Sequence, residues 1–229
     1  MAEQIAEQIA GLPAAALRPY VDRYVGYRYE GFAPGIHVGL PSGHLTFIVS
    51  LGAPLDVAEC LDAGAPRQQL TALVGGLHTR PAAVHHDGNQ YGVQLSLTPL
   101  GARALFGMPA GEIAERTLPM DPVLGRVTGE LVDRLRSAST WSQRFAVLDH
   151  VLVRSLPDTV PVAPEVRFAW RRLTAAGGAI PIATLADEVG WTRRHMTERF
   201  RREFGLGPKT AARVVRFDRA RRMFVAGRA

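Results

Sequence analysis

The stretch Ile182-Ala183-Thr184-Leu185-Ala186-Asp187-Glu188-Val189-Gly190-Trp191-Thr192-Arg193-Arg194-His195-Met196 decides how the C-terminal part of the chain folds. Its periodicity predicts two short helices, while Gly190 and Thr192 predict a tight turn and a helix cap, because glycine tolerates a positive φ and threonine caps N-termini. The inner helix faces are apolar: Leu185, Ala186 and Val189, then Met196, Phe200 and Phe204. This pattern is typical of a helix-turn-helix, whose second helix reads the major groove of DNA.

The outward face of the second helix is polar and rich in arginine. Arginine pairs with guanine O6 and N7, a carboxylate accepts from cytosine N4, and the threonine methyl contacts thymine. We therefore predict base contacts from Arg194, Thr197 and Glu198. We predict phosphate contacts from Thr192, Arg193, Arg201 and Lys209. The alternative reading is a solvated basic helix on a small helical bundle.

Charge is divided unevenly along the 229 residues. Residues 163–229 hold fifteen basic and six acidic residues, a net of +9, whereas residues 1–162 hold twelve and fifteen, a net of −3. A basic segment of this kind favours a polyanionic partner. The sequence has no long apolar run, no secretory signal and a single cysteine, Cys60, which cannot form an internal disulfide. We expect a cytoplasmic protein without a membrane partner.

Periodicity and turn signals divide the rest of the chain into regions. Residues 2–17 repeat Ala-Glu-Gln-Ile at a four-residue step, which predicts a short helix or a frayed tail. Residues 20–97 hold short β-branched and alternating segments between turn signals, which predicts a small antiparallel sheet or barrel of unknown strand order. Helical periodicity over residues 99–157, with Thr140 as a cap, predicts helices that cover one face of that sheet.

The expected fold class is therefore α+β. Residues 1–156 are expected to form a small antiparallel β domain with covering helices, which senses or dimerises. Three prolines within residues 157–164 indicate a linker. Residues 165–229 are expected to form an all-α helix-turn-helix domain.

Several short motifs of the C-terminal region carry a family resemblance. Leu185-Ala186, Gly190-Trp191-Thr192 and Arg199-Phe200-Arg201-Arg202 are followed by Gly205 and Pro208 and then by a long helix. In this pattern residues 178–224 resemble the first helix-turn-helix module of the AraC/XylS family of bacterial transcription regulators. The resemblance implies a regulator that binds double-stranded DNA. It also implies an N-terminal domain that senses a small-molecule effector or forms a homodimer.

The chain departs from this family pattern at three points. Gly207 stands where a Ser or Thr would cap the next helix, which weakens the cap by about a few tenths of a kcal/mol. Glu198 stands where the family commonly has arginine, so the base preference of the family is not carried over to this chain. The second module of the family is not found, and we infer a truncated form or a one-module variant. A single module predicts weak, salt-sensitive DNA binding.

The second interpretation is a cupin-like small-molecule binder or metal-dependent enzyme with a basic helical appendage. His85 and His86 are adjacent and would point to opposite faces of a strand, so they cannot share one inward metal site. His37, His44 and His78 lie on or near expected strands, but the sequence has no His-x-His pair. We therefore predict no metal ligand, no cofactor and no catalytic residue, and we favour the regulator over an enzyme.

Overall fold

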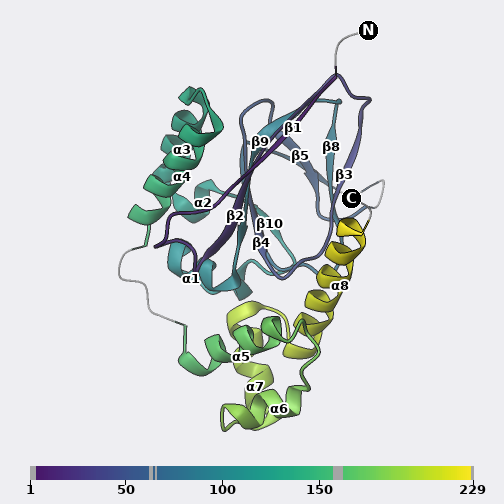
Figure 1. Cartoon of the computed structure of the whole chain (residues 1–229), viewed down its shortest axis with the longest axis vertical. Coiled ribbons are helices and arrows are strands. Elements are labelled where there is room, and N and C mark those ends of the chain that lie inside the picture. The colour runs from purple at the N-terminus through teal and green to yellow at the C-terminus, as the bar shows by residue number, and fades with distance from the viewer. Residues whose placement is uncertain (1–3, 62–63, 65, 157–161, 228–229) are drawn as a thin grey trace.

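The computed structural model describes residues 4–61, 64, 66–156 and 162–227, and its class is α+β (Figure 1). The strands are β1 (Ile5–Gly11), β2 (Val21–Glu30), β3 (Gly35–Gly39), β4 (Leu45–Ser50), β5 (Leu55–Ala58), β6 (Arg67–Leu70), β7 (Ala72–Gly75), β8 (Ala82–His86), β9 (Gln90–Leu97) and β10 (Thr117–Pro119). The helices are α1 (Pro99–Phe106), the 3-10 turn η1 (Ala110–Glu112), α2 (Asp121–Leu124), α3 (Arg126–Ser137), α4 (Trp141–Arg154), α5 (Pro164–Ala175), α6 (Ile182–Glu188), α7 (Arg193–Phe204) and α8 (Pro208–Ala226).

The N-terminal β domain is built from two antiparallel sheets, with strand orders β1-β2-β9-β4-β7-β10 and β3-β8-β5-β6. Successive side chains of β4 point to opposite faces of the larger sheet. Leu45, Phe47 and Val49 are fully buried in the main hydrophobic core, whereas Thr46 and Ile48 line a cavity on the other face. The expected antiparallel β domain is confirmed. Strand β10, which pairs with β7, lies inside a region that we expected to be helical.

Helices α3 and α4 lie over one face of the larger sheet (Figure 1). Leu131 and Leu135 of α3 and Leu148 of α4 join the strand residues in the main core. The cap expected at Thr140 is confirmed, because its hydroxyl accepts a hydrogen bond from the Gln143 N–H at 3.3 Å. The Gln143 side chain in turn accepts from the Thr140 N–H, which completes a capping box.

This capping box leads to a stability prediction. Thr140→Ala removes the acceptor for the Gln143 N–H, so we expect a loss of about 1 kcal/mol in the free energy of unfolding. Ser139→Ala removes a neighbouring hydroxyl that caps nothing and should cost less than about 0.5 kcal/mol. Urea denaturation of the two variants measures the difference, and equal losses would show that the box does not stabilise α4.

The helix or tail expected for residues 2–17 is wrong, because residues 5–11 form strand β1. The strand pairs antiparallel with β2, from Ile5 opposite Glu30 to Gly11 opposite Tyr24. The Glu7 carboxylate also accepts a 2.9 Å hydrogen bond from the Trp141 indole N–H of α4. Pairing with the otherwise open edge of β2 satisfies a row of backbone groups, and this long-range gain outweighs the local four-residue period.

The C-terminal helical region contains the expected helix-turn-helix. Gly190 has φ 70° in the turn between α6 and α7, and the Thr192 hydroxyl accepts a 3.2 Å hydrogen bond from the His195 N–H. Leu185 and Ala186 are fully buried. The same holds for Met196, Phe200 and Phe204 on α7. Of the expected linker, residues 157–161 lie outside the described residues, and Pro164 already begins α5.

Candidate nucleic-acid interface and intersheet cavity

The outward side of α7 forms one open hollow, which we call the recognition face. It is lined by Arg193, Arg194, Thr197, Glu198, Arg201 and Arg202. All of these residues are exposed except Thr197, which is half-buried. The opposite side of α7 lies in the helical core, so burial of three large apolar side chains holds the polar side outward.

Charges on the recognition face are available to a ligand. Within the described part of the chain, none of the arginines on this face is ion-paired, nor is Glu198. The Thr197 hydroxyl donates a 2.8 Å hydrogen bond to the Arg193 carbonyl. The methyl group is therefore the part of the Thr197 side chain that is left to contact a ligand. The face therefore presents four guanidinium groups and one carboxylate without internal neutralisation.

Two of the predicted phosphate contacts lie outside this hollow. Thr192 is exposed at the N-cap of α7, where its oxygen already serves the cap. Lys209 is exposed near the start of α8, behind Gly207, which provides no side-chain cap. Arg202, which we assigned no contact, lines the hollow with the others. The predicted base contacts Arg194, Thr197 and Glu198 are brought together, and their roles stay predictions.

The inner side of α7 is joined to the N-terminal β domain by an ion pair. Arg103 of α1 donates two hydrogen bonds to the Glu203 carboxylate, at 2.9 and 2.8 Å. The side chains are 22% and 10% exposed, so both charges are largely withdrawn from water. Hydrogen bonding to Glu203 raises the pKa of Arg103. We call this pair the α1–α7 latch. Sequence reasoning missed it, because 100 positions separate the partners.

Backbone approaches and apolar contacts reinforce the latch. A Cβ at Gly111 of η1 would lie 2.6 Å from the Arg202 carbonyl oxygen of α7, so only glycine fits there without movement. Gly205, with φ 78°, faces the same segment. Leu77 and Leu100 of the β domain pack into the helical core. The two parts of the molecule therefore share a packed junction.

The second feature is a cavity of about 310 Å³ between the two sheets, which we call the intersheet cavity. Its apolar wall comes from both sheets: Ile48, Val57, Leu73 and Val84. Three histidines of the sequence analysis, His37, His44 and His78, also line it. Among the described residues, no group of three His, Cys, Asp or Glu side chains is arranged to hold a metal ion.

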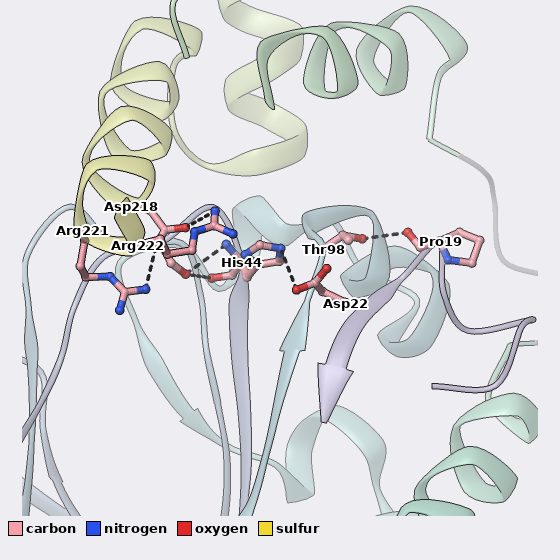
Figure 2. Close-up of polar contacts among 8 residues, drawn as sticks. Pro19, Asp22, His44, Thr98, Asp218, Arg221 and Arg222 are labelled. Carbon is pink, nitrogen blue, oxygen red and sulfur yellow. Dashed lines mark hydrogen bonds and ion pairs between the residues drawn. The ribbon is translucent and has the colours of Figure 1, made fainter. Parts of the chain in front are cut away.

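Helix α8 closes one end of the intersheet cavity (Figure 2). Its Asp218 side chain, 3% exposed, accepts hydrogen bonds from Arg221 and Arg222, each at 2.7 Å. Across the opening, Nε2 of His44 lies 4.0 Å from Oδ2 of Asp22. The Nε of Arg221 is buried and has no hydrogen-bond partner among the described residues. Polar groups of both parts of the molecule thus meet at this opening.

Burial dominates the electrostatics of two cavity histidines. It lowers the pKa of His78 below the ordinary value of 6.5, against the opposing influence of Glu115 and Glu59. Burial also lowers the pKa of His44, although Asp22 and Asp218 act in the other direction. Both imidazoles are therefore neutral at pH 7.

These pKa shifts predict acid destabilisation. Below pH 6.5 the unfolded chain binds protons that the folded His78 rejects, so the free energy of unfolding falls with decreasing pH. His78→Gln should make this decline shallower between pH 7.5 and 5.5, while Gln94→Asn, which removes no titratable group from the same cavity, should leave its slope unchanged. Urea midpoints across this range provide the measurement. A decline as steep in His78→Gln as in the parent protein would exclude His78 as a source.

Comparisons with known proteins give remote similarities. Residues 10–119 match a family model described as Domain of unknown function (DUF6597), which covers less than half of the chain. No curated protein sequence matches the chain. No helix in the described residues has the length and apolar character needed to cross a bilayer.

Three solved structures are similar at low identity. A ToxT variant from Vibrio cholerae is 8% identical over 87% of this chain and 82% of its own, with a TM-score of 0.48. The AraC-like transcriptional activator CuxR is 12% identical over 97% and 95%, with a TM-score of 0.32. A cupin domain from Bordetella pertussis is 14% identical over 43% and 98%, with a TM-score of 0.29. TM-scores below 0.5 do not establish the function of this chain.

Proposed function

We propose that this protein is a transcription regulator that binds double-stranded DNA with the recognition face in the major groove. The observation that carries the proposal is that face itself: four exposed arginines and two polar side chains without internal ion pairs, supported by a buried apolar underside. The net charge of +9 over residues 163–229 adds long-range attraction to a polyanion. Arg194, Thr197 and Glu198 contact bases in this proposal. Thr192, Arg193, Arg201 and Lys209 contact phosphates.

The intersheet cavity supports a sensing role for the N-terminal β domain. It is concave, and its lining combines apolar side chains from both sheets with numerous polar and charged groups, so it suits a small molecule that has both apolar and polar parts. Because Asp218, Arg221 and Arg222 of α8 stand at its opening, an effector bound there would touch the helix that follows α7. Effector binding would thus bias the position of the helix-turn-helix. We also infer a cytoplasmic, non-enzymatic protein.

Base and phosphate contacts predict different responses to mutation. Arg194→Ala should reduce the preference for the selected sequence over random DNA, with a loss of about 1–3 kcal/mol on the preferred site. Lys209→Ala should weaken binding to all sequences alike and lower the salt slope by about one. Fluorescence anisotropy of the full chain, on duplexes selected from a random library and at several salt concentrations, measures both effects.

Two results would contradict the proposal. A DNA affinity independent of salt would remove the electrostatic contact. Equal losses on all sequences in both variants would remove the assigned division between base and phosphate contacts. Arg126→Ala on α3 is the matched control, because this exposed arginine lies far from α7 in the chain and belongs to the covering helices.

A further inference from the structure

A second cleft lies between the N-terminal β domain and the helical region, separate from the intersheet cavity. We call it the interdomain cleft, and its volume is about 570 Å³. Tyr20 and Arg103 line it from the β domain, while Arg167, Trp170 and Arg171 of α5 line it from the helical region. Leu100, Ala104 and Trp170 give the cleft an apolar part of its lining.

The charged residues that line the interdomain cleft are all positive. No Asp or Glu occurs among the residues that line it. Arg103 is neutralised by Glu203 in the latch. In the part of the chain that the structure describes, the guanidinium groups of Arg167 and Arg171 have no carboxylate partner, and both residues are exposed. The α5 wall therefore carries two uncompensated positive charges.

The spacing of these two charges selects the chemistry of a ligand. Residues four apart on a helix lie side by side, about 5–6 Å between Cβ atoms, and like charges there are mutually unfavourable. A single dianion bound between them relieves the repulsion and accepts from both guanidinium forks, which match phosphate geometry. A carboxylate carries only one charge. The cleft also has room for an organic group beside the aromatic Tyr20 and Trp170.

We propose that the interdomain cleft binds a small phosphate-bearing anion through Arg167 and Arg171. A ligand in this position contacts α5 of the helical region and Tyr20 of the β domain at once. Its binding would therefore strengthen the junction that the latch already forms. The site does not depend on DNA recognition by α7, and the two proposals can fail separately.

Calorimetric titration of the full chain with inorganic pyrophosphate tests the site. We expect saturable binding that weakens at least about tenfold in Arg167→Gln and in Arg171→Gln, since each variant loses one charge-assisted contact. Both side chains are exposed, so the variants should fold, and circular dichroism verifies this. Arg126→Gln, which removes an exposed charge elsewhere, should bind pyrophosphate like the parent protein.

Several outcomes would overturn the proposal. These are the absence of binding at millimolar pyrophosphate, unchanged binding in both cleft variants, and equal weakening in Arg126→Gln. Weakening in Arg201→Gln but not in the cleft variants would place the anion on the recognition face. If pyrophosphate does not bind but Arg167→Gln with Arg171→Gln lowers the salt slope of DNA binding by about two, these arginines contact the DNA backbone instead.

Discussion

Phe200→Ala is expected to unfold the helix-turn-helix at a denaturant concentration far below that of the parent protein. Phe200 is fully buried and packs against Trp170 and Phe204, with ring centroids 5.8 and 4.7 Å away. Truncation to alanine removes most of the side chain and leaves a cavity among α5, α6 and α7. Substitutions of this kind cost about 3–5 kcal/mol, a large share of the stability of a domain.

The tryptophan fluorescence of the chain reports this loss, because the Trp170 indole lies against Phe200, although Trp141 and Trp191 also contribute to the signal. Denaturation curves of the variant and the parent protein give the change in free energy. Phe168→Ala is the control: it lies on the same helix as Trp170, but the Phe168 residue is 43% exposed, so its truncation should cost less than about 1 kcal/mol. A similar cost at both positions would show that α7 is not held by its apolar side.

The helix-turn-helix could be predicted from the sequence because its determinants are local. Gly190, Thr192 and the apolar positions around them lie within the twenty residues 185–204, and turn, cap and helix period all favour the same structure. The capping box at Thr140 is equally local. In each case the structure agrees with the sequence because no distant partner competes.

Features made by distant partners could not be predicted in this way. Strand β1 forms because β2 offers an open edge, a fact that residues 2–17 do not contain. The α1–α7 latch joins residues 100 positions apart, and the opening of the intersheet cavity joins His44 to the neighbourhood of Asp218. In the sequence, Glu203 and Asp218 are only two of the six acidic residues of a basic region. The partner of Glu203 became known with the tertiary fold, whereas Asp218 accepts from Arg221 and Arg222, three and four positions along the same helix.

Breaking the latch is the second change with a large expected effect. Arg103→Met leaves the Glu203 carboxylate withdrawn from water without a counter-charge. We expect a loss of about 2 kcal/mol, below the ~3–5 kcal/mol of a fully buried pair, because 22% of the Arg103 side chain stays exposed. Adding Glu203→Leu removes the stranded charge and should restore most of this loss, since well-packed apolar replacements of such pairs are often neutral.

A double-mutant cycle on the two positions measures the coupling. The pair Arg134–Glu130 on α3 is the control, because its side chains are 37% and 54% exposed and Arg134→Met should cost less than about 1 kcal/mol. Additive losses in the Arg103 and Glu203 variants would show that the two charges do not interact in solution.

Helix α7 contributes to two surfaces, the junction with the β domain and the recognition face, and variants of the latch test whether the two are coupled. Glu203 lies on the buried side of the helix, whereas the recognition face is open to solvent. Removing both latch charges should therefore leave the base preference of the protein unchanged, even where it alters the overall DNA affinity. If Arg103→Met with Glu203→Leu changed which sequences are preferred, the junction would shape the recognition face itself. In that case an effector could alter sequence choice as well as affinity, because α1 and the intersheet cavity belong to the same β domain.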